Sequence, residues 1–376
     1  MTHKKDKIRL ALIGVGTMGK VHAKRLLEGL APSMELTALC DTHVREDELF
    51  SGLPFYTSVE ELFARETLDA VFIATPHYLH ANLGVAALEH GLHTLVEKPM
   101  AANKEGCERL LEAQKRSGKV LSVMLSMRTK PVYRKVKELL DTGALGTVRR
   151  VHWIASNWFR TQKYYASSSW RGSWKGEGGG VLLNQCPHQL DLFSWFMGQP
   201  EKVTAFCGFG RYHDIEAEDD VTAVLHYPDG MKAVFVASTG ESPGTDRLEI
   251  VGEMGRLIAE GGRLHWDRNR VAMTDFSRTT ETLMDRPECE SFEVPLEPQK
   301  DSGHMQIFEN FARAILYGEE LIAPAHEGML GVELANAMQY STWTDSTVAL
   351  PLESAAFLEK LEEIVSPAGE PSLVGA

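Results

Sequence analysis

Short apolar runs alternate with amphipathic segments over the first third of the chain. The apolar runs are typical of buried parallel strands and fall at 8–13, 34–40, 70–74, 93–96 and 120–124, with a shorter candidate at 53–56. The segments between them have helical spacing, with a capping residue at Ser58 and another at Asn103. This alternation predicts an α/β fold with a doubly wound parallel sheet.

From Val148 onward the pattern changes to alternating polar and apolar positions. Candidate strands fall at 148–158, 203–210, 221–226, 231–238, 248–251 and 256–260, and candidate helices at 131–142, 187–197, 302–317 and 326–345. Short turns at 227–230 and 253–255 imply antiparallel neighbours. We therefore predict a doubly wound α/β domain over 1–127 and an α+β domain with an open, mostly antiparallel sheet over 128–376, ending in a loosely ordered tail at 366–376.

A glycine-rich turn follows the first strand and fits the pattern G-x-G-x-x-G. Gly14 permits the tight turn, Gly16 lets a pyrophosphate approach the backbone, and Gly19 lets the helix pack on the strand. Thr17 and Met18 open that helix, whose N-terminal N–H groups attract phosphate. Asp41 ends the second strand, where its carboxylate binds ribose hydroxyls and repels a 2′-phosphate. The turn predicts a dinucleotide site that favours NAD over NADP, although Arg45 is near.

Polar residues that follow the next strands are expected to face the same crevice, because carboxyl ends of parallel strands share one edge. They are Thr75, Pro76, His77, His80, Glu97 and Lys98. Lys98 is placed to bond a substrate hydroxyl and stabilise a developing alkoxide, and the alternative is a surface lysine before a turn. No metal site is expected from the histidines, because no cysteine or carboxylate completes a ligand set.

An aromatic and cationic stretch marks the second domain. Its candidate substrate residues are Trp158, Arg160, Tyr164, Trp170 and Arg171. Aromatic rings suit sugar rings, although core packing would also explain them. Downstream, Pro187 starts a helix that places His188 in its first turn, where a neutral imidazole can accept a proton, and Asn184 lies just upstream. A merely solvated His188 is the alternative, and a nucleophilic Cys186 is disfavoured because nothing suggests an acyl substrate.

The composition of the chain excludes some classes of binding partner and indicates a cellular compartment. The chain has 376 residues and a formal net charge of −13, which argues against nucleic acid or an anionic membrane as a main partner. Its five cysteines are scattered without a C-x-x-C pair, so we expect reduced thiols and a cytoplasmic location. No apolar stretch is long enough to span a bilayer.

These motifs together resemble the Gfo/Idh/MocA oxidoreductases. The resemblance rests on the Gly14/Gly16/Gly19 turn, Ala74-Thr75-Pro76, Glu97-Lys98-Pro99 and the stretch from Gly178 to His188 and Asp191. It implies an NAD-binding Rossmann domain over 1–127, followed over 128–376 by an α+β domain with a large open, mostly antiparallel sheet. It also implies nicotinamide-dependent oxidation of a sugar or cyclitol hydroxyl, and a homodimer or homotetramer formed through the C-terminal sheet.

The resemblance also implies residue roles. Lys98 resembles the family's catalytic lysine and His188 its catalytic histidine. Asn184 stands where many members have Asp, and an amide can orient a hydroxyl but cannot relay a proton. His77 replaces the usual Asn. Arg128 resembles an arginine expected to contact cofactor or substrate, and His304 is a further candidate at the substrate.

The leading hypothesis is an NAD-dependent dehydrogenase acting on a CH–OH group of a sugar, glycoside or cyclitol. The alternative enzyme is an NAD-dependent glycosidase or lyase, in which transient oxidation is followed by elimination and return of the hydride. A third hypothesis is a non-catalytic NAD-binding sensor, which would need neither Lys98 nor His188.

Overall fold

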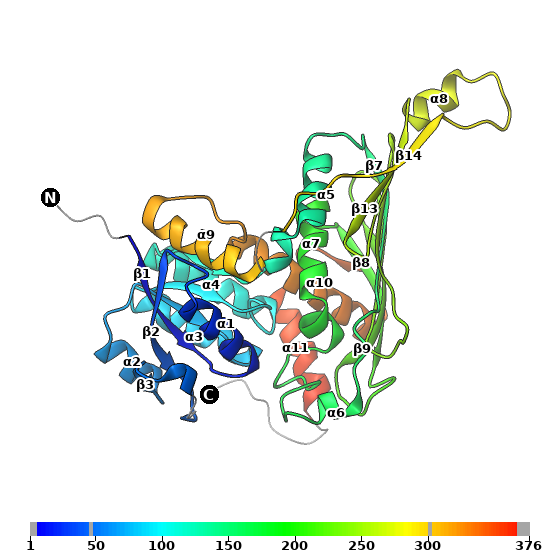
Figure 1. Ribbon diagram of the computed structural model, residues 1–376. Coiled ribbons are helices and arrows are strands. Elements are labelled where there is room, and N and C mark those ends of the chain that lie inside the picture. The colour runs from blue at the N-terminus through cyan, green and yellow to red at the C-terminus, as the bar shows by residue number, and fades with distance from the viewer. Residues whose placement is uncertain (1–5, 45–47, 300–302, 367–376) are drawn as a thin grey trace. The chain divides into compact units, whose positions relative to one another are not determined.

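The computed structural model describes residues 6–44, 48–299 and 303–366 (Figure 1). Arg45 and the tail from 367 lie outside the described residues. The chain divides into two compact units. The first comprises Met1–Thr129, Gly176–Gly178 and Lys300–Val332, and the second comprises Lys130–Lys175, Gly179–Gln299 and Glu333–Ala376. The predicted N-terminal domain was contiguous, whereas the observed first unit is assembled from three segments.

The first unit contains a six-stranded parallel sheet in the order β3-β2-β1-β4-β5-β6, which confirms the predicted doubly wound sheet. Its strands are β1 Ile8–Ile13, β2 Met34–Cys40, β3 Phe55–Tyr56, β4 Ala70–Ile73, β5 His93–Val96 and β6 Leu121–Val123. The apolar runs predicted these strands because both sheet faces are covered, so almost every position is buried.

Helices connect these strands. They are α1 Thr17–Leu27, α2 Val59–Arg65, α3 His77–Glu89 and α4 Lys104–Ser117, with short turns at η1 Glu48–Phe50 and η2 Ser126–Thr129. Both predicted N-caps form: Ser58 accepts from Glu61 N at 3.2 Å, and Asn103 accepts from Gly106 N at 2.9 Å. The sequence pattern therefore specified where these two helices begin.

The later segment of the first unit packs directly on this sheet. Helix α9, Gly303–Tyr317, brings Phe308 against Phe72 of β4 with ring centroids 4.9 Å apart. Glu309 accepts hydrogen bonds from the Ser33 hydroxyl at 2.6 Å and the Ser33 N–H at 3.0 Å. Ser122 of β6 donates to Ala323 O at 2.8 Å. These contacts explain why residues beyond 300 belong to the first core.

The second unit is built on a nine-stranded sheet in the order β14-β13-β12-β11-β7-β10-β9-β8-β15. Its strands are β7 Val148–Ala155, β8 Lys202–Phe209, β9 Glu218–His226, β10 Lys232–Ser238, β11 Asp246–Gly252, β12 Gly255–Glu260, β13 Arg263–Asn269, β14 Cys289–Glu293 and β15 Val348–Ala349. Only β7 and β10 pair in parallel among these described strands, so the sheet is mostly antiparallel, as predicted.

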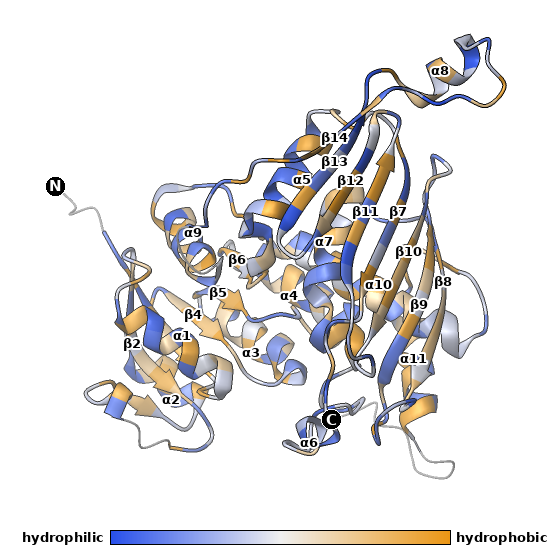
Figure 2. Cartoon of the chain, turned by 45° about the vertical axis from the view of Figure 1, so that its right-hand side comes forward, coloured by the Kyte–Doolittle hydropathy of each residue, from blue (hydrophilic) through white to orange (hydrophobic). Residues whose placement is uncertain are grey.

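Helices cover one face of this sheet (Figure 1). They include α5 Pro131–Asp141, α7 Pro187–Met197 and α11 Ser354–Val365, together with α10 Ala325–Trp343, which begins in the first unit and ends in the second. Phe193 of α7 stacks on Trp153 of β7 at 6.2 Å and meets Phe235 of β10 at 6.4 Å. Large aromatic residues therefore fill the layer between helices and sheet. Between β13 and β14 the chain extends beyond the sheet as an arm that contains α8, Met273–Thr279 (Figure 2).

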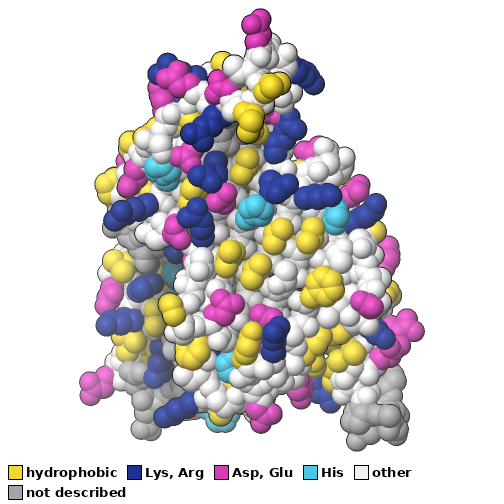
Figure 3. Space-filling model, turned by 90° about the vertical axis from the view of Figure 1, so that its right-hand side faces the viewer, with side chains coloured by type: hydrophobic (Ala, Val, Ile, Leu, Met, Phe, Trp, Pro, Cys, Tyr) yellow, Lys and Arg dark blue, Asp and Glu magenta, His cyan; other side chains and the backbone are white. Residues whose placement is uncertain are grey.

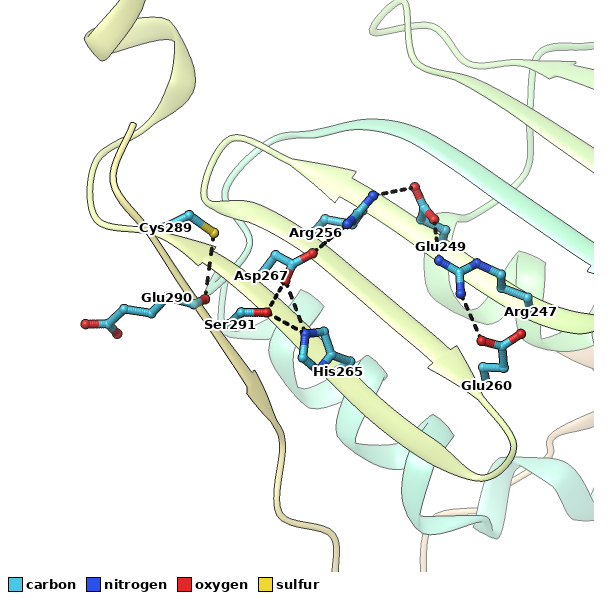
Figure 4. A network of polar contacts seen from close by, with 9 residues as sticks. All are labelled: Arg247, Glu249, Arg256, Glu260, His265, Asp267, Cys289, Glu290 and Ser291. Carbon is cyan, nitrogen blue, oxygen red and sulfur yellow. Dashed lines mark hydrogen bonds and ion pairs between the residues drawn. The ribbon is translucent and has the colours of Figure 1, made fainter. Parts of the chain in front are cut away.

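The opposite sheet face carries alternating polar and apolar side chains (Figure 3). At its β11–β14 end, carboxylates bridge basic groups on neighbouring strands (Figure 4). Arg256 pairs with Asp267 at 2.6 Å and with Glu249 at 3.5 Å, and Arg247 pairs with Glu260 at 2.9 Å. Such cross-strand pairs fix neighbouring strands in register.

Candidate active site

The glycine turn has the shape that a dinucleotide requires. Gly14 has a φ of 96°, and a Cβ built there would lie 2.7 Å from the Ala74 carbonyl carbon. A Cβ on Gly19 would lie 2.0 Å from Gly14 O, whereas one on Gly16 would meet nothing within 4 Å. The turn is therefore closed by packing at Gly14 and Gly19 and open at Gly16, the position where a phosphate would approach.

The helix that follows has N–H groups without a side-chain cap, because its N-cap is Gly16. Thr17 and Met18, in its first turn, are exposed. Asp41 follows β2 and accepts a hydrogen bond from Val15 N at 2.8 Å, which holds its carboxylate beside the turn. The turn, the helix end and Asp41 thus lie together at one edge of the sheet, and the residues present fit NAD.

The loop after β4 is held by buried histidines. His77 donates from Nδ1 to Glu177 O at 3.1 Å. His80 has Nδ1 2.8 Å from Pro99 O and Nε2 2.9 Å from Thr75 O. Burial lowers the pKa of both imidazoles, so His80 is neutral and has one N–H to share between two carbonyls. Both histidines therefore join loops of the first unit.

Thr75 contributes a polar atom of a different kind. Its hydroxyl oxygen is buried and has no hydrogen-bond partner among the described residues. A buried hydroxyl without a partner costs free energy, which a ligand atom or water can relieve. Pro76 caps α3 directly after it. The position of Thr75 at the carboxyl edge of β4 fits its predicted role beside the cofactor.

Glu97 and Lys98 follow β5 directly. Glu97 accepts hydrogen bonds from His22 Nε2 at 2.9 Å and from the backbone N–H of Lys98 at 2.8 Å. Burial alone would raise the pKa of the Glu97 carboxyl, but the hydrogen bond from His22 and nearby positive charge outweigh it and lower the pKa to about 2. Glu97 is therefore an ionised, buried anchor for the backbone of Lys98, whose own side chain is half-buried.

Two predicted site residues serve contacts inside the first unit. His304 lies with its ring 5.2 Å from that of His22 and its Nε2 3.4 Å from the Ser126 hydroxyl, and burial lowers its pKa to about 4. Arg128 is buried, forms an ion pair with Glu327 and donates to Ile322 O at 3.2 Å. These contacts tie η2 to the segments beyond residue 303. Their predicted roles toward cofactor or substrate stay predictions.

In the second unit, a buried carboxylate organises the glycine run before α7. Glu218 Oε1 accepts from Gly180 N at 2.9 Å and from Leu182 N at 3.1 Å, and Oε2 accepts from Gln339 at 3.3 Å. A Cβ on Gly180 would lie 2.0 Å from Glu218 O. Burial raises the pKa of Glu218 to about 7, although these hydrogen bonds act in the opposite direction. Glu218 thus fixes the start of a single π-helical turn, η3 Val181–Gln185.

That turn presents Asn184 and Gln185 to Tyr164. The Tyr164 hydroxyl oxygen accepts from Arg171 Nη1 at 2.6 Å and Gln185 Nε2 at 3.0 Å, with Asn184 Nδ2 at 3.3 Å. Gln185 Oε1 in turn accepts from Arg160 Nη2 at 2.6 Å. The structure therefore brings together Arg160, Tyr164, Arg171 and Asn184, all predicted site residues. Arg171 and Asn184 bond Tyr164 directly, and Arg160 is joined to it through Gln185, which the sequence did not single out.

The aromatic and cationic residues of this stretch are stacked in alternation. The Arg160 guanidinium lies 5.5 Å from the Trp158 ring and 5.0 Å from the Tyr164 ring. The Arg171 guanidinium lies 4.4 Å from the Tyr164 ring and 4.7 Å from the Trp170 ring. The five side chains form a cation–π ladder in the order Trp158, Arg160, Tyr164, Arg171, Trp170. They line a half-buried surface and not the core, which instead uses Trp153.

His188 occupies the first turn of α7, as predicted, with Pro187 at the first helical position. Its side chain is half-buried, while the neighbouring Gln189 and Asp191 are buried.

The structure adds three supporting residues to those predicted from the sequence: His22, Gln185 and Glu218. Only His22 carried a sequence signal, since it lies on the apolar side of the first helix.

The described ranges contain neither a cluster of metal-binding side chains nor a membrane-spanning helix. Among these residues, no group of three or more His, Cys, Asp or Glu side chains could hold a metal ion. Within the same ranges, every helix is too short or too polar to span a bilayer.

Comparison with known proteins agrees with this geometry. Residues 8–125 match the model of an oxidoreductase family with an NAD-binding Rossmann fold, and residues 133–258 match the GFO/IDH/MocA C-terminal domain. The uncharacterized oxidoreductase YdgJ of Escherichia coli is 32% identical over 263 residues, covering 69% of this chain and 70% of that protein.

Two further relatives differ in how much they share. The 2,7-anhydro-N-acetylneuraminate hydratase of Mediterraneibacter gnavus is 31% identical over 184 residues, 48% of this chain and 48% of that enzyme. The crystal structure of the WlbA dehydrogenase from Bordetella pertussis in complex with NADH and UDP-GlcNAcA matches with a TM-score of 0.77 and 27% identity, over 92% of this chain and 100% of that chain. For several curated relatives, this chain spans only 48 to 62% of their length.

Proposed function

Because this chain belongs to the NAD-binding oxidoreductases of the Gfo/Idh/MocA family, we propose that it is a dehydrogenase of a secondary hydroxyl on a sugar, glycoside or cyclitol. Lys98 and His188 are its proposed catalytic pair. The relatives support the substrate class, since one is a hydratase named for an anhydro sugar acid and another a dehydrogenase crystallised with NADH and UDP-GlcNAcA.

The observation that carries the proposal is the place of Lys98 relative to the glycine turn. Ile13 of β1 pairs with Ile73 of β4, which pairs with Val96 of β5. Gly14 and the Glu97–Lys98 segment therefore leave the same edge of the sheet, two strands apart. Glu97 holds the backbone of Lys98 at the edge of the sheet that also carries the dinucleotide turn, and the charge of this lysine suits a developing alkoxide.

In the proposed reaction, the substrate hydroxyl bonds to both Lys98 and His188. His188 takes the hydroxyl proton on its imidazole, while Lys98 stabilises the oxygen as negative charge develops. Asn184 orients the substrate without relaying a proton. When bound, NAD supplies the nicotinamide that accepts the hydride.

The test separates chemistry from cofactor binding. Lys98→Ala and His188→Ala should each lower kcat with an active sugar by about 10²-fold or more, because general base and alkoxide stabilisation are lost. NAD affinity, followed by calorimetry, should change little. Lys163→Ala replaces an exposed lysine of the second unit and is the matched control. Wild-type turnover in either site variant would exclude this pair.

A redox-neutral cleavage or hydration is the second candidate, and the similarity to a hydratase favours it. The two reactions differ in stoichiometry. A dehydrogenase accumulates NADH with the ketone product, whereas the redox-neutral reaction changes the sugar without net NADH. One time-resolved absorbance experiment with chromogenic glycosides, free sugars and inositols distinguishes them.

We also propose that two copies associate through the uncovered face of the nine-stranded sheet. Phe206 of β8 and Ile154 of β7 alternate with buried neighbours and so point to this face, with exposed fractions of 66% and 38%. Figure 3 shows hydrophobic and charged side chains mixed on this face. Exposed aromatic and aliphatic side chains on a broad face are typical of a subunit interface.

The five cysteines are free thiols, which supports the cytoplasm as the proposed location.

A further inference from the structure

The cation–π ladder of the second unit contains an arginine, Arg160, that pairs with no carboxylate in the described part of the chain. Arg160 donates to two neutral acceptors, Gln185 Oε1 at 2.6 Å and Phe159 O at 3.1 Å. Within residues 6–44, 48–299 and 303–366 it forms no ion pair. A half-buried guanidinium without a counter-ion is unusual in a chain of net charge −13.

The other arginines of the same unit provide an internal comparison. Six pair with carboxylates: Arg149, Arg211, Arg247, Arg256, Arg268 and Arg270. Apart from Arg160 and Arg171, which both belong to the ladder, the remaining arginines of this unit form no ion pair in the described residues and are all exposed: Arg134, Arg150, Arg263, Arg278 and Arg286. Arg160 differs from all of these arginines, because it is half-buried and no carboxylate of the described residues pairs with it.

Two buried N–H donors at the same end of the ladder also lack acceptors. Arg160 Nε and Trp158 Nε1 have no hydrogen-bond partner among the described residues. A buried donor without an acceptor is costly, and oxygen atoms of a ligand would satisfy it. The Arg160 guanidinium also lies close to the rings of Trp158 and Tyr164, and its planar fork of N–H donors suits carboxylate and phosphate.

The ladder is joined to the proposed chemistry by hydrogen bonds. Gln185 links Arg160 to Tyr164, and Tyr164 meets Asn184, four residues before His188. A negatively charged group held by the ladder would therefore lie on the same substrate as the hydroxyl oriented by Asn184.

We propose that the substrate carries an anionic substituent, a carboxylate or a phosphate, which is bound by Arg160 together with Arg171 of the cation–π ladder. This proposal rests on the proposed function for the hydroxyl chemistry but not for the binding. It assigns the ladder to recognition of sugar acids or sugar phosphates in preference to neutral sugars.

The experiment compares matched ligands on the full chain saturated with NADH. The neutral and acidic pairs are D-glucose with D-glucuronate, D-galactose with D-galacturonate, and UDP-GlcNAc with UDP-GlcNAcA, and glucose 6-phosphate is the phosphate arm. Calorimetry gives the affinities. At least one acid should bind about tenfold or more tightly than its neutral partner, and the ratio should fall with added salt. The glucose 6-phosphate arm distinguishes phosphate from carboxylate.

Variants assign the preference to the ladder. Arg160→Gln should abolish the ratio, and Arg160→Lys should retain part of it, because charge persists without the planar fork. Arg150→Gln removes an exposed arginine of β7 and should leave the ratio unchanged. Circular dichroism and thermal melting establish that each variant folds.

The outcomes separate this proposal from the proposed function. Equal or weaker binding of every acid, or a preference that survives in Arg160→Gln, overturns the anionic substrate. Oxidation of neutral sugars without any acid preference does the same while leaving the dehydrogenase intact. Acids that bind through Arg160 but are never oxidised would support the anion site and reject the dehydrogenase.

Discussion

His22 and Glu97 are 75 residues apart in the chain, yet His22 Nε2 lies 2.9 Å from Glu97 Oε1 in the core of the first unit. The second oxygen of the same carboxylate accepts the backbone N–H of Lys98. A histidine on the helix after the glycine turn thus acts, through one buried carboxylate, on the position of the proposed catalytic lysine. His22 is a positioning residue in this arrangement.

His22→Leu should destabilise the protein by about 2–4 kcal/mol at pH 7, because Glu97 would remain buried and lose the hydrogen bond from the His22 imidazole. The pKa of Glu97 lies below its ordinary value of 4.5 in the folded chain, so its stabilising contribution is present above pH 4.5 and is lost as the pH falls towards 2. Urea unfolding across this range should show a smaller acid loss in the variant. His226→Leu, on the second sheet, is the control. An equal acid loss in His22→Leu and wild type would contradict the link.

Substitutions at two glycines of the turn should have different effects, one on NAD affinity and the other on stability. Gly16→Ala places its methyl group in open space, so stability should be retained while NAD affinity falls about tenfold or more. Gly19→Ala forces a methyl group against Gly14 O, so the protein should lose stability whether or not NAD is present. Thermal melting without ligand, followed by NAD titration, measures both. Unchanged NAD affinity in Gly16→Ala would place the pyrophosphate elsewhere.

Glu218 makes stability depend on pH in the opposite sense from Glu97. Its pKa is about 7 in the folded chain against 4.5 ordinarily, so its contribution is complete below pH 4.5 and is lost as the pH rises through 7. Glu218→Gln cannot ionise, and a fall in stability on the order of 3 kcal/mol between pH 4.5 and 8 should be absent in this variant. Denaturant unfolding at both pH values, with the exposed Glu241→Gln as control, measures the difference. The same pH dependence in Glu218→Gln and wild type would contradict an ionisable clamp.

A charge introduced on the uncovered face of the nine-stranded sheet should weaken the proposed association of two copies. Phe206→Glu places a carboxylate where a second copy is proposed to pack, so the oligomer should dissociate towards monomer at micromolar concentration. Light scattering after gel filtration measures the mass. Leu30→Glu, which alters an exposed residue of the first unit, should leave the mass unchanged. A monomeric wild-type protein, or an unaffected variant, would rule out this face.

The first sheet could be predicted because its strands are buried on both faces and therefore appear as unbroken apolar runs, such as Ala70–Ile73. The edge strands of the second sheet carry a weaker signal. Strand β13 has only Leu264 and Trp266 pointing into the core, and β14 is largely exposed, so neither was predicted. The π-helical turn at Val181–Gln185 was also missed, because its apolar run fits either a strand or a helix.

Motif spacing identified the residues at the ends of elements, including the Gly14 turn, Lys98 and His188. The supports of those residues come from distant parts of the chain. Glu218 contacts Gly180 across 38 residues and Gln339 across 121. Nothing in local spacing encodes such contacts, because they exist only once the strands and helices have packed.

The three-segment make-up of the first unit has a consequence for synthesis. A ribosome releases β6, which ends at Val123, long before helix α9, which begins at Gly303. Until then Phe72 lacks the cover of Phe308, and Ser33 lacks Glu309. The nucleotide-binding core therefore stays incomplete while every strand of the nine-stranded sheet except β15 is synthesised. During this period its uncovered apolar surface is available for chaperones to bind. A fragment that stops at residue 129 would leave this apolar surface exposed, because it lacks helix α9. The two units therefore cannot be expressed separately by dividing the gene at a single position.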